Sequence, residues 1–515
     1  MPPSQTRAEP PILHAAMQND FDLLIIGGGI NGAGIARDAA GRGASVCLVE
    51  KDDLAQATSS ASTKLVHGGL RYLEHLEFRL VRESLIERER LLQIAPHIIW
   101  PLRFVLPHDK GLRPKWMLRL GLFLYDHLGG RKLLPPTSDV DLREPPHGAV
   151  LEDRLTHGWE YSDCWVEDSR LVALNALDAK EHGADIRTRT ECVELERRKS
   201  AWIATLRTSE GGEERITARA VINAAGPWVD TVLGRALPKE NHTNLRLVKG
   251  SHLIFPRLYD GDHCYIFQNR DDRIIFAIPY ERNFTLVGTT DQGFEGDPAG
   301  IDISAEEAAY ICEAANEYLR ADVTPDQAVA SYAGVRPLYE NNAASNSTVT
   351  RDYQFELDQG ENGEDPPILS IFGGKITTYR KLAEHALEKL PGFSTHQWTA
   401  DEALPGGDIP VDQYDNRLAQ LMMRIDWFPP EGLRRLYRAY GTRVERILGG
   451  AKSLADLGTH FGGDFYEAEL RYLVETEFAR SAEDVLYRRS KLYLHLAKDE
   501  QSRVYDWFKR GLVAA

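Results

Sequence analysis

Residues 21–50 have the sequence FDLLIIGGGINGAGIARDAAGRGASVCLVE, in which a short apolar run precedes a glycine-rich turn, a segment of small residues and a second apolar run. The four apolar residues 23–26 are typical of a strand buried on both faces. Gly27, Gly29 and Gly32 then have the GxGxxG spacing, which allows a tight turn, close approach of the backbone to a pyrophosphate, and close packing of helix on strand. Free N–H groups and the helix dipole after such a turn bind phosphate. The pattern predicts a Rossmann-like, doubly wound α/β domain that binds a dinucleotide.

Glu50 ends the second apolar run, at the position where a bound dinucleotide places its ribose. A carboxylate there can accept a hydrogen bond from the ribose 2′-hydroxyl, and it would repel the 2′-phosphate of an NADP-type ligand. The predicted strand, turn, helix, second strand and acid follow one another in the order and at the spacing of a dinucleotide-binding unit. The motif therefore favours dinucleotide binding over a glycine-rich turn without a ligand, but it does not separate FAD from NAD.

Composition narrows the class of protein. A chain of 515 residues, 43% hydrophobic and 27% charged, is long enough for two or three globular domains. The formal charge of −16 argues against a general nucleic-acid binder, although an anionic substrate would still need a local basic site. The cysteines are scattered without CxxC spacing, which indicates reduced thiols in a cytosolic compartment and no metal or iron–sulfur site.

Two further features concern targeting and membranes. Residues 1–20 are polar and contain proline, so we expect a mobile extension and no signal peptide; no run of eighteen apolar residues predicts a transmembrane helix. Residues 113–132 are rich in Leu, Trp, Met and Phe and carry five Lys or Arg against one Asp. Such a segment suits an in-plane membrane anchor, and equally an internal helix whose basic ends are solvated.

Other segments carry residues that suit a bound dinucleotide. Residues 57–64 are rich in Ser and Thr and lead to His67-Gly68-Gly69, where a planar ring can approach closely, although such a run could also be a solvated loop. An apolar strand ends at Gly226, and a second strand, glycine turn and helix follow at residues 368–380. The residues that we predict to contact the cofactor are Gly27, Gly29, Asn31, Gly32, Glu50, Thr58, Ser59, Ser62, Thr63, Gly68, Gly226, Gly373, Gly374, Lys375, Thr377 and Thr378.

The domains are predicted to interleave, because β-like runs separate the cofactor segments. Runs between residues 245 and 289 predict an antiparallel sheet over the cofactor, and helical patterns continue beyond a linker at residues 401–408. The predicted parts are a mobile extension (1–20), a discontinuous cofactor domain (21–95, 160–235 and 336–395), a substrate or cap domain (96–159 and 236–335) and a C-terminal helical domain (400–515).

The chain resembles the FAD-dependent, membrane-associated sn-glycerol-3-phosphate dehydrogenases of the aerobic bacterial type in the runs IIGGGINGAGIARDAAGRG, ATSSASTKLVHGGLRYLEH, GLFLYDHLG, NAAGPWV, KGSHLIFP, YAGVRPL, TRDY and FGGKITTYRKLAEHALEKL. The resemblance extends from about residue 21 nearly to the C-terminus. It implies FAD as cofactor and oxidation of sn-glycerol 3-phosphate to dihydroxyacetone phosphate, with hydride passing to flavin N5 and electrons to a membrane quinone, ubiquinone or menaquinone.

The resemblance also implies a location and an assembly. The protein is expected as a peripheral enzyme on the cytoplasmic face of the inner membrane, and as a homodimer. Residues 113–132 would then contact anionic lipid, where their positive charge offsets the repulsion between the acidic protein and the membrane.

A phosphomonoester dianion needs several cations around it, and bidentate Arg is the strongest of them. The positions that match substrate-site residues of the family are Arg71, Tyr72, Arg336, Arg351 and Lys375. The resemblance thus predicts that segments far apart in the chain meet around one phosphate.

Oxidation at C2 also requires a base, because the hydroxyl proton must leave with the hydride. His252, in the run KGSHL, is the first candidate and His67 the second, and Arg336 completes the predicted catalytic set. His67 could instead pack on the flavin ring or attach it covalently.

Three alternatives stay open at this point. A soluble glycerol-3-phosphate oxidase would pass electrons to O2 and release H2O2. An amine or amino-acid oxidase would bind a carboxylate, for which one arginine suffices, so the other cations would have no role. A redox-sensing or assembly protein would bind FAD without turnover.

Overall fold

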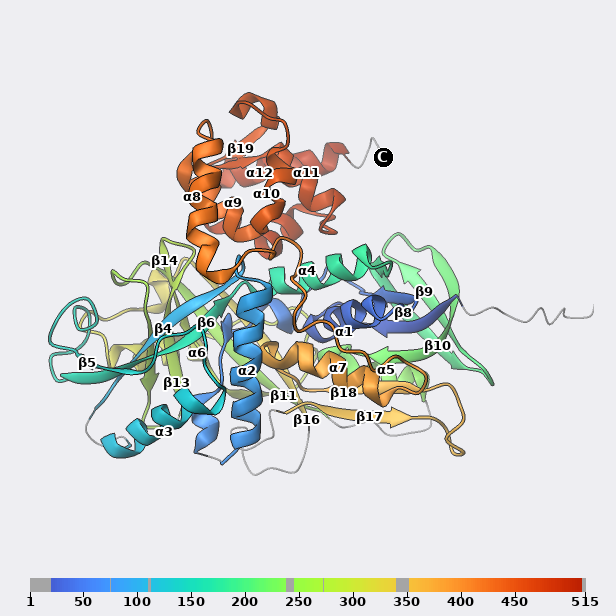
Figure 1. Cartoon of the computed structure of the whole chain (residues 1–515), viewed down its shortest axis with the longest axis horizontal. Helices are drawn as coiled ribbons and strands as arrows, with labels where there is room; N and C mark the ends of the chain where they lie inside the picture. Colours follow the sequence, from blue (N-terminus) through green and yellow to red (C-terminus); the bar gives the residue numbers. More distant parts are fainter. Residues whose placement is uncertain are drawn as a thin grey trace, which may run out of the picture.

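The computed structural model describes residues 20–74, 76–109, 113–237, 245–271, 273–339 and 352–511 (Figure 1). Two sheets lie side by side, and the C-terminal helices form a separate layer above them in this view. The predicted extension, apart from Asp20, and the predicted substrate residue Arg351 lie outside the described residues.

The first sheet is the predicted doubly wound one. Its parallel strands, in the spatial order β18-β10-β1-β2-β7, are β1 (Phe21–Ile26), β2 (Val46–Val49), β7 (Asp185–Arg187), β10 (Glu213–Asn223) and β18 (Ile368–Phe372). β17 (Gln354–Asp358) runs antiparallel to β18, while β8 (Thr190–Arg197) and β9 (Trp202–Thr208) form a hairpin on the first half of β10. The apolar residues of β1 and β2 are almost completely buried, as strands covered on both faces require.

Helices pack on this sheet through small residues. α1 (Ile30–Gly41) contacts both α4 (Asp168–Glu181) and α7 (Tyr379–Lys389), and α5 (Val229–Ala236) contacts β8, β10 and β18. A Cβ added at Gly34 of α1 would lie 2.7 Å from the Tyr379 ring, so the small residues of α1 allow the close approach of α7.

The second sheet covers the carboxyl ends of the first. Its strands are β3 (Leu65–Val66), β4 (Ile99–Pro107), β5 (Ser138–Asp141), β6 (His157–Val166), β11 (Leu245–Pro256), β12 (Cys264–Gln268), β13 (Ile274–Tyr280), β14 (Phe284–Gly288), β15 (Gln292–Phe294) and β16 (Ala330–Tyr339). We predicted an antiparallel sheet, but β12 and β4 pair in parallel, which a long crossover between distant segments makes possible. The boundaries predicted at residues 160 and 336 fall inside β6 and β16 of this sheet.

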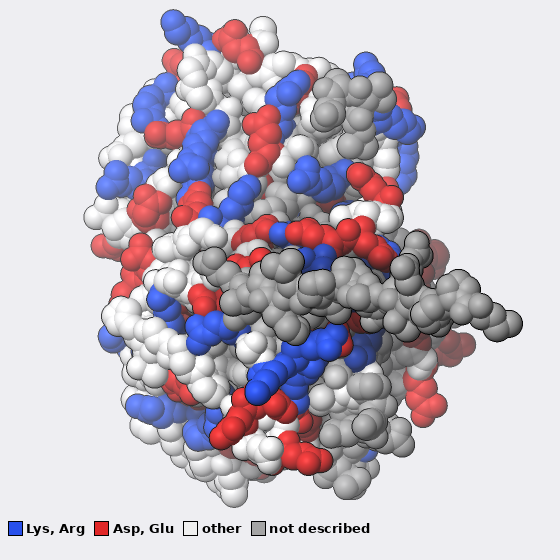
Figure 2. All heavy atoms as spheres, turned by 90° about the vertical axis from the view of Figure 1, so that its right-hand side faces the viewer, with Lys and Arg blue, Asp and Glu red and all other residues white. Residues whose placement is uncertain are grey.

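Three helices accompany the second sheet: α2 (Phe78–Ile94), α3 (Lys115–Leu128) and α6 (Ala305–Asn316). Among the described residues, no helix combines the length and the apolar composition that crossing a membrane requires. On the face shown in Figure 2, Lys and Arg side chains are interspersed with Asp and Glu, which is typical of a surface whose charges pair with one another.

The C-terminal domain has a hydrophobic core of its own. Its elements are α8 (Tyr414–Arg424), α9 (Pro430–Tyr440), α10 (Val444–Leu448), α11 (Glu467–Glu475), α12 (Lys498–Gly511) and the short strands β19 (His460–Gly462) and β20 (Phe465–Tyr466). Buried ion pairs such as Arg170–Glu477 join it to α4 of the cofactor domain.

Candidate active site

Two adjoining cavities lie at the carboxyl ends of the parallel strands. The first is lined by the turn after β1, the end of β2 and the segments that begin at Gly226 and Gly373. The second lies between the two sheets and is lined by His67, Arg336 and Lys375 among others. The residues that line both cavities are Ile30, Thr58, Ser59, Pro337 and Gly374. One elongated ligand can therefore occupy both, with its two halves in different cavities.

The glycine turn after β1 has room for a ligand because side chains are absent. Gly27 has a φ of +114°, and a Cβ there would lie 2.5 Å from the carbonyl oxygen of Ala224. A Cβ at Gly32 would lie 1.9 Å from the carbonyl oxygen of Gly27, so Gly32 serves the packing of α1 and does not itself line a cavity. These are the roles that the GxGxxG spacing predicts for its first and third glycines.

Glu50 lines the first cavity at the end of β2. Its carboxylate oxygens accept hydrogen bonds from the N–H groups of Gly28, at 2.7 Å, and Asp52, at 2.9 Å. Burial raises the pKa of Glu50 above its usual value, and these two backbone hydrogen bonds oppose the shift. The acid is thus held at the place where the sequence predicts the ribose.

The predicted Ser and Thr residues at 58–63 line the cavities, but their hydroxyl groups also bind protein. Thr58 Oγ1 donates to the Val335 carbonyl at 2.7 Å, and Ser62 Oγ donates to Asp168 at 2.8 Å. Ser59 Oγ accepts from the N–H of Ile30 at 3.0 Å, which caps the start of α1. The run therefore fixes the cavity wall to three neighbouring elements, a role that its composition alone does not reveal.

Besides Gly32, three predicted residues do not line either cavity. Gly68 is buried, and its N–H donates to the Tyr125 hydroxyl at 2.7 Å. Thr378 is buried just before α7. His252 lies behind Thr63, whose Oγ1 is 3.1 Å from its Nε2, and its ring stacks on that of Tyr332. Residues close to each of them in the sequence line the second cavity, but these three are themselves buried in the interior.

The surroundings of His252 keep it uncharged. Burial, followed by the charges of Arg336 and Lys64, lowers the pKa of His252 well below its usual value. The imidazole is thus neutral at physiological pH and forms part of the support of the wall.

Cations from separate segments meet in the second cavity. Arg71, Tyr72, Arg336 and Lys375, the described residues of the predicted substrate site, all line it. The Lys375 ammonium lies 3.9 Å from the centre of the Tyr72 ring, and the Arg336 guanidinium donates to Asp291 and Thr289 at 3.3 Å each. Such an arrangement suits an anionic group.

Arg273 also lines this cavity and was not predicted. Its Nε donates to Asp271 at 2.7 Å, and its guanidinium lies 3.8 Å from the centre of the Tyr310 ring. It sits in the charged run NRDDR, which has no motif, so the sequence contains no signal for this residue.

His67 lines the second cavity as well. Its backbone N–H donates to Thr377 Oγ1 at 3.2 Å, and its carbonyl accepts from the same hydroxyl at 3.3 Å. The contact joins the segment after β3 to the start of α7, which explains why two runs so far apart in sequence form one wall.

The residues present fit a flavin dinucleotide. A helix N-terminus, an acid at the end of β2 and glycines without side chains surround the first cavity. Asn31 Oδ1, at the start of α1, is buried and has no hydrogen-bond partner among the described residues, so this acceptor is available to a donor of a bound group. The second cavity is open enough between the sheets to admit a ring.

Comparisons with known proteins bear on the family of the chain and on its cofactor. Residues 22–378 match the family of FAD dependent oxidoreductases, and residues 397–510 match the C-terminal domain of alpha-glycerophosphate oxidase. The chain is 51% identical over 498 residues to D-erythritol 1-phosphate dehydrogenase of Brucella abortus, covering 96% of this chain and 99% of that one. It is also 51% identical over 498 residues to glycerol-3-phosphate dehydrogenase of Pseudomonas aeruginosa, covering 96% of each.

The structure of glycerol-3-phosphate dehydrogenase from Bacillus halodurans, complexed with FAD, superposes with a TM-score of 0.72 at 27% identity, covering 95% of this chain and 94% of that one. The predicted fold class, the predicted family and the predicted cofactor are confirmed. The chain belongs to the FAD-dependent oxidoreductases, in the same family as the bacterial glycerol-3-phosphate dehydrogenases, and FAD is its cofactor.

Proposed function

We propose that this enzyme oxidises sn-glycerol 3-phosphate to dihydroxyacetone phosphate and passes the electrons to a membrane quinone. The observation that carries the proposal is the set of cations in the cavity between the sheets, where Arg71, Arg273, Arg336 and Lys375 surround one space. A phosphomonoester dianion uses several cations, whereas the carboxylate of an amino acid needs a single arginine. The same cations therefore argue against an amino-acid oxidase.

The residues of the second cavity have different roles in binding and catalysis. The arginines hold the phosphate, and we assign to His67 the removal of the C2 hydroxyl proton, because it lines the cavity and His252 does not. Bound FAD supplies the acceptor for the hydride that leaves C2, so that the alcohol becomes a ketone. His252 supports Thr63 in the wall and, being neutral, adds no charge to the phosphate site.

A second candidate substrate is D-erythritol 1-phosphate, because the Brucella abortus enzyme that acts on it is as similar to this chain as the Pseudomonas aeruginosa glycerol-3-phosphate dehydrogenase. Both substrates combine a phosphomonoester with a secondary alcohol. The cations of the second cavity suit either, and the difference between them lies in the length of the polyol.

The first prediction is that sn-glycerol 3-phosphate bleaches the flavin absorbance under anaerobic conditions, with at least 10-fold higher kcat/KM than D-erythritol 1-phosphate. One methylene-sized difference in a fitted pocket changes binding by about 1–3 kcal/mol, or roughly 10- to 200-fold. Glycerol, which lacks the phosphate, is the control and should not bleach it. Absence of bleaching by either phosphate would favour a protein that binds FAD without turnover.

The electron acceptor is tested in the same cuvette. After reduction, short-chain ubiquinone or menaquinone should restore the flavin colour within seconds, and air should do so slowly. Fast recovery in air with release of H2O2 would instead identify a glycerol-3-phosphate oxidase.

We further propose that α3 contacts the anionic surface of the membrane, on the cytoplasmic face of the inner membrane. Leu118, Leu122 and Tyr125 bury one face of α3 against the protein, while the opposite face is exposed. Trp116 is 69% exposed, Leu120 51% and Phe123 57%. Exposed apolar side chains between basic ones are what an in-plane anchor requires. In Figure 1, α3 lies at the end of the molecule opposite the C-terminal domain.

The second prediction concerns this helix. Replacing Trp116, Leu120 and Phe123 together with Gln should lower binding to vesicles of anionic phospholipid about 100-fold, since each side chain contributes roughly 1 kcal/mol when half of it is buried. Flotation with vesicles measures the effect. Met423→Gln is the matched control, because Met423 is 74% exposed on α8 of the C-terminal domain. Equal flotation of the triple variant and the control would place the membrane contact elsewhere.

The homodimer implied by the family resemblance stays a prediction. Mass measurement of the detergent-solubilised enzyme by light scattering tests it, and a mass of one chain would contradict it.

A further inference from the structure

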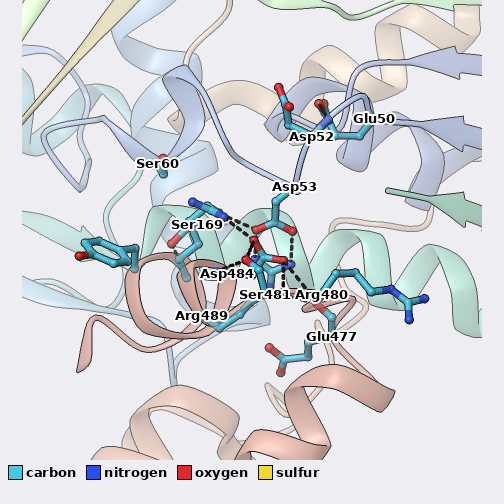
Figure 3. Close-up of polar contacts among 12 residues, drawn as sticks. Glu50, Asp52, Asp53, Ser60, Ser169, Glu477, Arg480, Ser481, Asp484 and Arg489 are labelled. Atoms are coloured by element: carbon cyan, nitrogen blue, oxygen red, sulfur yellow. Dashed lines mark hydrogen bonds and ion pairs between the residues drawn. The ribbon is translucent and has the colours of Figure 1, made fainter. Parts of the chain in front are cut away.

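The loop after β2 has two sides with different partners. On one side, Glu50 and Asp52 line the first cavity. On the other, Asp53 points toward the C-terminal domain, where it faces Arg489 and Asp484 (Figure 3). The loop that carries the ribose-binding acid thus lies between the cofactor and the helical domain.

Asp53 is held by two consecutive arginines of the C-terminal domain. Arg489 binds it with both Nη atoms, each at 2.8 Å from a different carboxylate oxygen, and Arg488 Nε lies 2.5 Å from Oδ2. The side chains of Asp53 and Arg489 are 1% and 0% exposed. Burial raises the pKa of Asp53, but Arg489 and Arg488 outweigh it and leave that pKa below its usual value. The carboxylate is therefore charged, paired and shielded from water.

The two arginines are themselves fixed. Arg489 Nε donates to the Glu477 carbonyl at 3.0 Å, and the Arg488 carbonyl accepts from Ser169 Oγ at 2.6 Å. An ion pair in the opposite direction accompanies them, because Arg170 of α4 reaches into the C-terminal domain and binds both oxygens of Glu477 at 2.8 Å. Each domain thus inserts a buried charge into the other, and separating them would leave uncompensated buried charges on both sides.

Backbone hydrogen bonds connect Asp53 to the cavity. The N–H of Asp52 donates to Glu50 at 2.9 Å, and the Asp52 carbonyl accepts from the N–H of Arg189. The N–H of Ala55 donates to the carbonyl of Gly28, in the glycine turn itself. Displacement of Asp53 would therefore displace both the Glu50 carboxylate and the turn.

We propose that the C-terminal domain is a working part of the FAD site: Arg488 and Arg489, acting through Asp53, position the loop that presents Glu50 to the cofactor. In this arrangement Asp53, Arg488 and Arg489 are positioning residues, since they do not line the cavity. The role is independent of which alcohol phosphate the enzyme oxidises.

The test measures FAD binding directly, by quenching of flavin fluorescence when apoprotein is added. In metal sites, removing a residue that orients a direct ligand of the metal weakens metal binding about 10- to 100-fold. Arg489 orients the loop that carries Glu50 in the same way, so we expect Arg489→Met to weaken FAD binding by a similar factor. At saturating FAD, kcat and KM for the alcohol phosphate should stay within about 3-fold of the parent, because the second cavity is untouched. FAD dissociation equal to that of the parent would refute the proposal.

A double-variant comparison separates positioning from general weakening. If Arg489 acts through the loop that carries Glu50, Arg489→Met and Glu50→Gln combined should weaken FAD binding by less than the product of their separate factors, because neighbouring residues of one network are not additive. If the two substitutions weakened FAD binding by factors that simply multiply, Arg489 would not act through the loop that carries Glu50.

Two further variants separate the proposed role of Arg489 from misfolding and from a general weakening of the domain interface. Arg489→Lys keeps the positive charge but not the bidentate geometry, and we expect it to weaken FAD binding about 3- to 10-fold. It provides the test if the Arg489→Met variant does not fold. Arg443→Met removes another ion pair of the same domain interface, with Glu181, at the far end of α4. It should leave FAD binding within about 2-fold, and an effect as large as that of Arg489 would show that any loss at the interface suffices.

Discussion

His67→Asn should lower kcat for sn-glycerol 3-phosphate about 10²- to 10⁴-fold, the range that a positioned base contributes. His67 lines the cavity that contains the cations, and the Thr377 hydroxyl binds both the backbone N–H and the carbonyl of His67. Asn retains polarity at this position but cannot take up the hydroxyl proton. Rapid mixing of the oxidised enzyme with substrate, followed at the flavin absorbance, measures the reductive step alone, and FAD content should stay unchanged.

His252→Asn provides the matched control for this prediction. The His252 ring is buried behind Thr63 and neutral, so its loss should affect the reductive step less than about 10-fold and act mainly through the wall. If His252→Asn proved the more damaging of the two, the base would be His252, as the sequence first suggested, and the cavity wall would have to open during turnover.

Gly32→Ala should yield protein with at least 10-fold less bound FAD and a lower melting temperature. The added Cβ would lie 1.9 Å from the carbonyl oxygen of Gly27, and a backbone atom cannot rotate away as a side chain can. Overpacking of this kind costs about 1–3 kcal/mol, and here it also moves the start of α1 from the phosphates. The ratio of flavin to protein absorbance after purification measures the loss.

Gly234→Ala is the control, because Gly234 lies in α5 with open space where its Cβ would be. Alanine favours the helix by about 1 kcal/mol, so this variant should keep its FAD and melt no lower than the parent. Retention of FAD by Gly32→Ala would mean that α1 can shift without loss of the site.

Local features of the site were predictable from the sequence, whereas contacts between distant segments were not. The glycine turn and Glu50 belong to one continuous β1–α1–β2 unit, whose geometry follows from residue type and spacing. Arg273 directly precedes β13, and it reaches the second cavity because β13 lies beside that cavity. A charged turn contains no sequence signal for this position of β13. Gly68 illustrates the reverse, since its neighbours His67 and Gly69 line the second cavity whereas the N–H of Gly68 donates to the hydroxyl of Tyr125 of α3.

Two of the predicted domain boundaries fall inside strands for a related reason. β6 and β16 each continue past the residues where composition changes, because strand pairing with β4 and β11 determines where they end. Periodicity reports which residues are buried, but not which sheet buries them.

The order of the strands in the first sheet also has consequences for synthesis. β10 lies between β1 and β18, yet β18 follows β1 only after most of the chain, and Gly373 and Gly374 of the first cavity come after it. At about 5–20 residues per second, a ribosome needs roughly 7–30 s to travel from the end of β10 to β18. During that interval one edge of β10 has no native partner and no complete pocket exists for FAD, so a nascent chain cannot gain stability from the cofactor. Chaperone protection of this edge until β18 has been synthesised would therefore favour the formation of active enzyme.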